Sequence, residues 1–245
     1  MSATTFVLVH GAWHDASCWD AVSGLLRAQN HTVLCPDLPG HGADSTALAR
    51  ITLKSYVTSL VNLLDSLTGK AVLVGHSMSG MVISEAASQL PQKISRLIYL
   101  SAYLPRQNES IFDLIALIRG DESLTSIEDA MQLSSDKRTC SIDQTSIIPL
   151  FYNLTPRSRT SQALSKFGKQ ATLPLSAKVR LDETALAAIP STYICCSEDK
   201  VIPVHHQRRM LARRTCDTVL QIKADHSPFY SAPEQLAALL HASAG

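Results

Sequence analysis

Short aliphatic runs alternate with longer amphipathic stretches along most of this chain. The runs carry few polar positions, which is typical of strands that are buried on both faces of a parallel sheet. The predicted strands are Thr5–Val9, Thr32–Cys35, Ala71–His76, Arg96–Ser101, Ser191–Cys196 and Thr218–Ile222. The stretches between them place apolar residues at helical spacing. The predicted helices are Cys18–Gln29, Leu53–Leu67, Met78–Leu90, Val204–Arg213 and Pro233–His241.

This alternation predicts an α/β fold with about six mainly parallel strands flanked by helices. It breaks between Arg106 and Asp182, where strong strand signals are absent and amphipathic helical pieces follow one another. These pieces are Ile111–Arg119, Ile127–Leu133, Ile142–Tyr152 and Arg159–Phe167. We therefore expect a helical cap at 106–185, inserted after the fourth strand between two parts of the core, 1–105 and 186–245.

The strand Ala71–His76 passes into a helix with almost no loop, and Ser77 stands at the corner. Such a corner strains the backbone of its central residue and lifts that side chain above the edge of the sheet. This is the nucleophile elbow, whose usual pattern is G-x-S-x-G. Here Ser79 stands at the second glycine position and Gly80 follows it; serine is still small enough to let strand and helix approach. The alternative is that Ser77 only caps the helix.

Acidic and histidine side chains follow later strands. In open parallel sheets the functional loops gather at the carboxyl ends of the strands. Glu198 and Asp199 follow the fifth predicted strand, and Asp225 and His226 follow the sixth. Together with Ser77 they give a serine, an acid and a histidine in the chain order of the α/β-hydrolases.

Each of these residue types has a role in acyl transfer. We expect Ser77 to be the nucleophile and His226 to be the base that takes its proton. A buried carboxylate then orients the imidazole, and we assign that role to Asp199. Asp225 is a rival for this role. It is adjacent to His226 in the sequence, however, and the side chains of adjacent residues point in different directions. Glu198 is a weaker rival, because it is Asp199 that begins the segment expected to form the loop leading into the next helix.

The negative oxygen of the tetrahedral intermediate needs hydrogen-bond donors. The backbone N–H of Met78 lies at the positive end of the helix after the elbow and is one such donor. The second is expected from the loop after the first strand, where we choose Ala12. Trp13 in the same loop is the predicted substrate-binding residue. His10 and His41 lie nearby and are expected to hold their glycine-rich turns.

Several of these segments together resemble a known family. They are Val7–His14, Gly75–Met81, Pro91–Ile94 and Ser101–Pro105. The chain resembles the α/β-hydrolase group of plant methylesterases and hydroxynitrile lyases, with their bacterial relatives. The resemblance implies hydrolysis of carboxylic esters without a cofactor, an apolar acyl or alcohol pocket formed by the cap, and Ala12 and Met78 as oxyanion donors.

Two positions depart from the hydroxynitrile lyases of this group. Those enzymes carry a threonine where this chain has Ala12, and a lysine where it has Ser227. Cyanohydrin chemistry needs a cation to hold the leaving cyanide. The two departures therefore argue against a lyase of that kind.

The composition and charge of the chain limit the partners and the cellular location that we expect for the protein. A net charge of +1 gives no field that favours nucleic acid, and the arginines of 208–214 are expected to form a solvated helix face. No apolar run reaches the roughly 20 residues that span a bilayer, and no signal-peptide pattern opens the chain. The six cysteines form neither a disulfide framework nor a metal motif. We expect a cytoplasmic protein with no metal and no membrane partner; a homodimer is left open.

These observations predict a serine hydrolase that cleaves a small or medium hydrophobic ester or lactone through an acyl-enzyme on Ser77. Two alternatives stay open. The same three residues could support non-hydrolytic chemistry, such as cyclisation, acyl transfer or a lyase reaction. The chain could also be a small-molecule binding protein with slow turnover.

Overall fold

A six-stranded parallel sheet forms the centre of the molecule. The computed structural model describes residues 3–118 and 127–244. In these residues the strand order is β2-β1-β3-β4-β8-β9, and all neighbouring strands are parallel. The strands are β1 (Thr5–Val9), β2 (Thr32–Leu34), β3 (Ala71–His76), β4 (Ile94–Leu100), β8 (Ser191–Cys196) and β9 (Thr218–Ile222). The predicted α/β architecture is confirmed.

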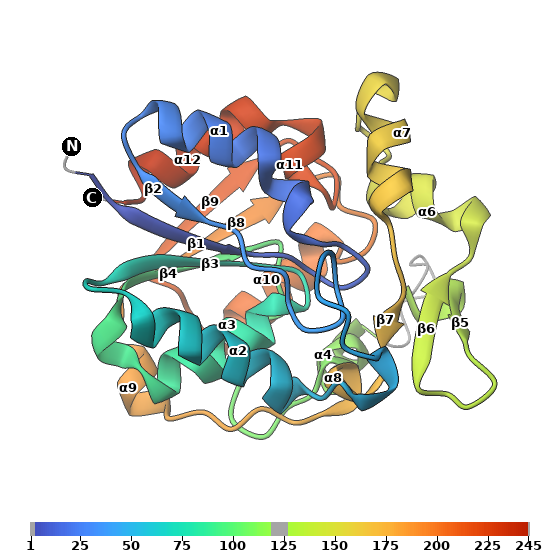
Figure 1. The fold of residues 1–245 in the computed structure, drawn as a ribbon, viewed down its shortest axis with the longest axis horizontal. Helices are drawn as coiled ribbons and strands as arrows, with labels where there is room; N and C mark the ends of the chain where they lie inside the picture. Colours follow the sequence, from blue (N-terminus) through green and yellow to red (C-terminus); the bar gives the residue numbers. More distant parts are fainter. Residues whose placement is uncertain (1–2, 119–126, 245) are drawn as a thin grey trace.

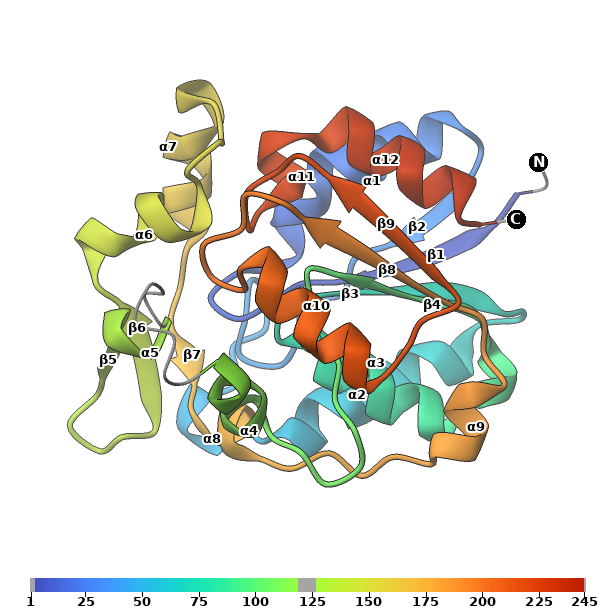
Figure 2. The same cartoon turned by 180° about the vertical axis from the view of Figure 1, so that it is seen from behind.

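Helices cover both faces of this sheet (Figures 1 and 2). One face carries α1 (Asp20–Ala28), α11 (Pro228–Ser231) and α12 (Pro233–Ala242). The other carries α2 (Leu53–Ser66), α3 (Ser79–Gln89), α9 (Glu183–Ala187) and α10 (Val204–Arg213). Short 3-10 turns lie at Ala16–Trp19, Leu48–Arg50 and Pro91–Lys93. Among the described residues, no helix is long and apolar enough to cross a membrane.

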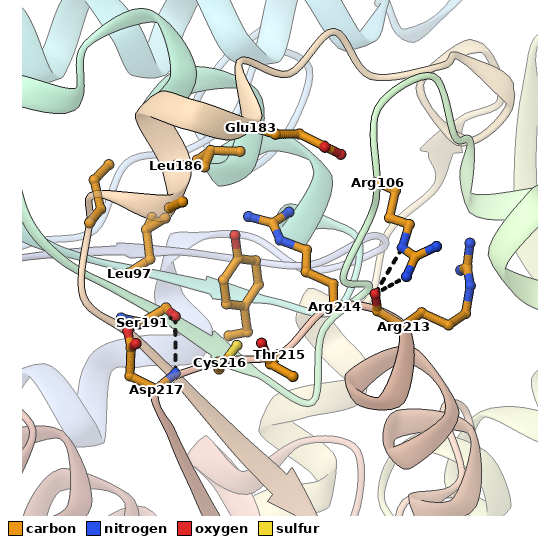
Figure 3. Close-up of a pocket in the computed structure, with 13 residues that line it drawn as sticks. Leu97, Arg106, Glu183, Leu186, Ser191, Arg213, Arg214, Thr215, Cys216 and Asp217 are labelled. Atoms are coloured by element: carbon orange, nitrogen blue, oxygen red, sulfur yellow. Dashed lines mark hydrogen bonds between the residues drawn. The ribbon is translucent and has the colours of Figure 1, made fainter.

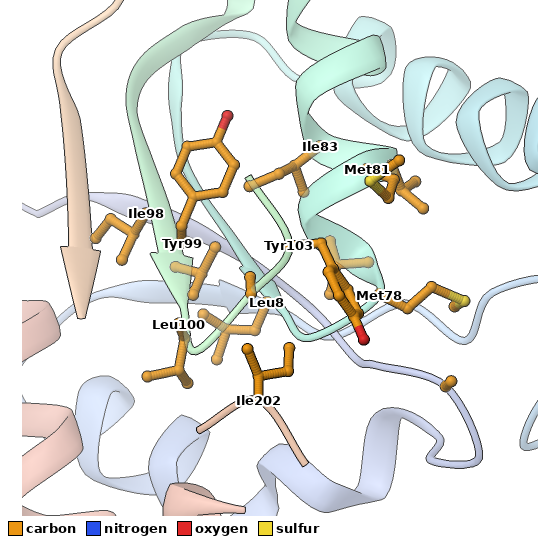
Figure 4. Packing of buried hydrophobic residues seen from close by; sticks show 14 of the residues in the cluster. Leu8, Met78, Met81, Ile83, Ile98, Tyr99, Leu100, Tyr103 and Ile202 are labelled. Atoms are coloured by element: carbon orange, nitrogen blue, oxygen red, sulfur yellow. The ribbon is translucent and has the colours of Figure 1, made fainter. Parts of the chain in front are cut away.

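Helix α3 packs closely against the sheet. Leu8 and the Ile98–Leu100 run of β4 pack near Ile83 of α3 (Figure 4). A Cβ at Gly75 would lie 2.8 Å from the Ser79 carbonyl oxygen, so glycine lets β3 and α3 approach closely. Each fully buried aliphatic side chain contributes about 1.5–3 kcal/mol. This packing fixes the corner at which the chain leaves β3.

The segment between β4 and β8 forms, as far as α8, a separate layer. It contains α4 (Ile111–Ile115), a 3-10 turn (Ala116–Ile118), α5 (Ile127–Ala130), β5 (Met131–Leu133), β6 (Thr139–Ile142), α6 (Gln144–Phe151), α7 (Arg157–Lys166), β7 (Gln170–Ala171) and α8 (Leu173–Ser176). The carboxyl ends of the central strands point toward this layer, and both termini lie at the opposite edge (Figure 1).

The absence of strands in this segment was predicted wrongly. β5, β6 and β7 form an antiparallel sheet in which Thr139 pairs with Ala171. These strands are too short to show a period-two pattern, and the partner of β6 comes from beyond two helices. The predicted helices 127–133 and 142–152 are accordingly shorter, since Met131–Leu133 is a strand and α6 begins only at Gln144. The predicted end of the first cap helix at Arg119 lies outside the described residues.

Candidate active site

Ser77 stands at the corner between β3 and α3 with a left-handed backbone. Its φ is 53°, a conformation that is costly for a residue other than glycine and persists only when neighbours hold it. The Ser77 amide donates to the Leu100 carbonyl at 3.3 Å, and the Tyr103 amide donates to the Ser77 carbonyl at 3.1 Å. The end of β4 therefore clamps this strained residue from both sides.

The residues after Ser77 explain the altered elbow pattern. A Cβ at Gly80 would clash with the Tyr103 carbonyl oxygen, so the closest approach falls at position 80. At position 79 a side chain has room, and the Ser79 hydroxyl donates to the His10 carbonyl. Ser79 thus links the elbow to the loop after β1, which a glycine at this position could not do.

The structure brings Ser77, His226 and Asp199 together. The Ser77 Oγ lies 3.0 Å from His226 Nε2, and His226 Nδ1 lies 2.7 Å from Asp199 Oδ2. All three side chains are buried. Because a carboxylate only accepts, Nδ1 carries the proton, and Nε2 is left free to accept from the serine hydroxyl.

The Asp199 carboxylate is fully hydrogen-bonded. Its Oδ1 accepts from the amides of Val201 and Ile202 at 2.7 and 2.8 Å. Its Oδ2 accepts from His226 and also from the hydroxyl of Ser101. Ser101 was not among the predicted site residues. Its position directly after β4, at the same edge of the sheet as Ser77, was the one signal that could have found it.

The rival carboxylates lie elsewhere. Asp225 accepts from the Leu154 amide at 3.0 Å and the Thr155 hydroxyl at 2.8 Å, in the segment that joins α6 to α7. It also accepts from the Ser227 amide, at the start of α11, and from the hydroxyl of Ser231 at the end of that helix. Burial raises the pKa of its carboxyl group. In the described chain, neither Asp225 nor Glu198 bonds to the His226 ring.

Ala12 and Met78 both line the cavity that Ser77 also lines. Within the described residues, neither N–H donates to another protein group. Two buried residues whose amides have no partner and which line the same cavity as the serine are what an oxyanion hole requires.

Two neighbours of Ala12 hold this loop to the layer above it. Burial lowers the pKa of His14 to about 4, so the ring is neutral. The ring donates from Nδ1 to the Ala12 carbonyl at 3.0 Å and accepts at Nε2 from the Tyr152 hydroxyl at 3.0 Å. Trp13, with φ at 61°, donates from its indole to the Cys140 carbonyl at 3.3 Å. The Trp13 carbonyl accepts from the Gly168 amide at 2.8 Å.

The other histidines near the site have structural contacts. His10 accepts from the Leu38 amide at 3.0 Å, and His41 bonds to the Tyr56 hydroxyl at 2.9 Å. Burial lowers the pKa of His10 to about 4 and that of His41 to about 3. His76, which the sequence did not single out, bonds through Nε2 to the His226 carbonyl at 2.7 Å and so supports the loop that carries His226.

A narrow cavity opens from Ser77 into the layer between β4 and β8. The core contributes Ala12, Ser77, Met78 and Tyr103 to its wall, and Trp13 lines it as well. The remaining lining residues are apolar and come mostly from that layer: Ile111, Phe112, Ile115, Ile127, Met131, Leu175 and Val201. The cavity therefore suits a hydrophobic group attached to the atom that Ser77 attacks.

A second, roomier pocket lies away from Ser77, near the amino ends of β8 and β9 (Figure 3). Its arginines already have partners within the protein. Arg106 donates to the Arg213 carbonyl, Arg213 pairs with Glu109, and Arg214 donates to the Pro105 carbonyl at 2.7 Å. No member of the serine–histidine–aspartate group lines it. Over the described residues, no cluster of three or more His, Cys, Asp or Glu side chains is placed to hold a metal ion.

Known proteins resemble this chain along nearly all of its length. The model of the family described as "Alpha/beta hydrolase family" matches residues 6–239. Methylesterase 7 of Arabidopsis thaliana is 34% identical, over 96% of this chain and 94% of that protein. A pyrethroid hydrolase of Sphingobium wenxiniae is 31% identical, over 97% of this chain and 86% of that protein.

Solved structures agree with these sequence matches. The crystal structure of a pyrethroid hydrolase from Sphingobium faniae superposes with a TM-score of 0.86 and 29% identity, over 99% of this chain and 98% of that one. A tomato methylketone synthase superposes with a TM-score of 0.88 at 23% identity, a likeness of fold alone. The chain belongs to the alpha/beta hydrolase family.

Proposed function

We propose that this protein is a serine hydrolase that cleaves a small or medium hydrophobic carboxylic ester or lactone. The observation that carries the proposal is the hydrogen-bonded series from Ser77 Oγ to His226 Nε2 at 3.0 Å and from His226 Nδ1 to Asp199 Oδ2 at 2.7 Å. The named relatives support it, because a methylesterase by its name cleaves methyl esters and a pyrethroid hydrolase hydrolyses a pyrethroid.

The proposed reaction has two halves. His226 takes the proton of Ser77 as the serine oxygen attacks the ester carbonyl carbon. The amides of Ala12 and Met78 stabilise the negative oxygen of the tetrahedral intermediate. His226 then returns the proton to the leaving alcohol, and an acyl-enzyme remains on Ser77. Water activated by His226 attacks this ester, and the acid leaves.

We further propose that residues 106–185 act as the cap over this site. Support comes from the contacts of Trp13 and His14 with Cys140, Gly168 and Tyr152, all of which belong to that segment. The apolar wall of the cavity comes largely from the same segment. This cap would exclude bulk water from the acyl-enzyme except for the water that His226 activates.

A stopped-flow time course with p-nitrophenyl butanoate tests the proposal on the wild type and on Ser77→Ala. We expect a burst of p-nitrophenol followed by steady turnover, and loss of about 10⁴-fold or more in kcat for the variant. Wild-type turnover by a folded Ser77→Ala protein would refute the proposal. A burst that stalls would instead indicate a binding protein. Products other than the free acid and alcohol would indicate transfer or lyase chemistry.

A further inference from the structure

Tyr103 is held directly beside the nucleophile. Its amide donates to the Ser77 carbonyl at 3.1 Å, and its carbonyl packs on Gly80 where no Cβ would fit. These two contacts fix the Tyr103 backbone against the elbow. Its side chain stands near Met78, which carries one of the two free amides (Figure 4). A group at the end of this ring can therefore meet a substrate bound at Ser77.

Among the residues that the structure describes, the Tyr103 hydroxyl has no hydrogen-bond partner. Tyr103 is only 4% exposed and lines the narrow cavity, yet no group of the described chain hydrogen-bonds to its hydroxyl oxygen. The fully buried tyrosines, in contrast, all have a partner for this group. Tyr56 bonds to His41, Tyr99 to Ser84, Tyr152 to His14, and Tyr193 to the Ala102 carbonyl.

The charge state of this phenol is settled by its surroundings. Burial raises the pKa of Tyr103, and the nearby carboxylates of Asp199 and Glu128 raise it further. The hydroxyl therefore keeps its proton at neutral pH and can donate it. An unpaired donor in an apolar cavity costs free energy unless a ligand supplies an acceptor.

The cavity is placed for the acyl part of an ester. The leaving oxygen must come within hydrogen-bond reach of His226 Nε2 in order to receive its proton. His226 does not line the cavity, whereas Ala12 and Met78, which would hold the carbonyl oxygen, do. The acyl group, on the side of the carbonyl carbon away from the leaving oxygen, is therefore the part that enters.

We propose that Tyr103 is a specificity-determining residue whose hydroxyl donates a hydrogen bond to an oxygen in the acyl part of the substrate. This inference rests on the proposed function. The preferred substrates are then esters of short acids that carry an ether, keto or hydroxyl oxygen near the ester carbonyl. Hydrocarbon acids of equal length are disfavoured, because they leave the Tyr103 hydroxyl unpaired.

The test compares wild type and Tyr103→Phe on two matched pairs of p-nitrophenyl esters. One pair is methoxyacetate and butanoate; the other is 3-methoxypropanoate and pentanoate. The oxygen replaces a methylene at two different distances from the carbonyl. For each pair, the ratio of kcat/KM between wild type and variant is compared between the two esters. This double ratio cancels the intrinsic reactivity of each ester.

We expect Tyr103→Phe to lose about tenfold in kcat/KM on at least one oxygen-bearing ester and to keep its activity on the paired alkyl ester. Tyr230→Phe is the matched control, because Tyr230 is also buried, its hydroxyl has no partner in the described chain, and it does not line the cavity. Its double ratios should stay at one.

Double ratios within twofold of one for both pairs would overturn the inference and leave the hydroxyl with a bound water only. An equal loss on all four esters would also overturn it, because Tyr103 would then serve structure. Measuring Ser77→Ala in the same experiment separates a failure of the Tyr103 inference from a failure of the proposed function. If that variant is inactive while the double ratios are one, the inference fails and the proposed function stands.

Discussion

Two loops at the same edge of the sheet each end in a buried aspartate, and the two carboxylates have different partners. Asp199, after β8, accepts from two amides of its own loop, from Ser101 and from His226. Asp225, after β9, accepts from Ser227 and Ser231 at the two ends of α11 and from the segment that joins α6 to α7. The first carboxylate orients an imidazole; the second holds the layer between β4 and β8 on the core.

The contrast shows that distance along the chain is a poor guide to partnership. Asp225 is next to His226 in sequence, but its oxygens point away from the ring. Asp199 is 27 residues earlier and contacts the ring. The strand that carries each residue, and the direction in which its loop leaves the sheet, decide which donors the carboxylate meets.

The largest effect is expected from Asp199→Asn. An amide in this position cannot accept equally at both ends, so the His226 ring loses the tautomer that leaves Nε2 free. We expect kcat on p-nitrophenyl butanoate to fall by about 10⁴-fold. A variant that keeps a tenth of the wild-type kcat would show that another group orients His226.

Asp225→Asn should separate stability from chemistry. The asparagine NH₂ group would face donors from Leu154 and Thr155 or from residues 227 and 231, so hydrogen bonds are lost in a buried place. We expect the free energy of unfolding to fall by about 1–3 kcal/mol. Urea denaturation measures this change, while kcat should fall far less than in Asp199→Asn. A loss of kcat as large as that of Asp199→Asn would remove the distinction between the two loops.

The smallest effects are expected from Ser101→Ala and Ser231→Ala, which each remove one hydroxyl donor from one of the carboxylates. Ser101→Ala should lower kcat by about tenfold, since about 1.4 kcal/mol of lost stabilisation is tenfold in rate. Ser231→Ala should lower only the free energy of unfolding, by about 1 kcal/mol. Paired kinetics and denaturation check both, and a reversal of the two outcomes would contradict this account.

Local patterns were enough to predict the central sheet and the residues that meet at its edge. Runs such as Ala71–His76 are apolar throughout, and the carboxyl ends of parallel strands share one edge, so Ser77, Asp199 and His226 could be placed together before the structure was known. The α/β fold predicted from these patterns is confirmed, and so is the family that the motifs resemble. The roles of the three residues stay predictions that the variants above test.

The features that the sequence did not predict depend on contacts between segments that are distant in the chain. β6 and β7 are too short to carry a periodic signal and pair across two helices. Ser101 gains a role only once Asp199 is beside it, and a serine at the end of a strand has no pattern of its own. The free Tyr103 hydroxyl likewise depends on what its surroundings lack, which local sequence cannot reveal.

The position of Trp13 between Ala12 and His14 has a consequence for timing. A cover held only by apolar contact could lift while the catalytic groups stayed in place. Here the indole and carbonyl of Trp13 hold Cys140 and Gly168, so lifting that layer pulls on the peptide next to the Ala12 amide. On the proposed mechanism, an opening of this layer that moved the Trp13 peptide would also displace the Ala12 amide, so the oxyanion hole would be complete only while the layer is closed.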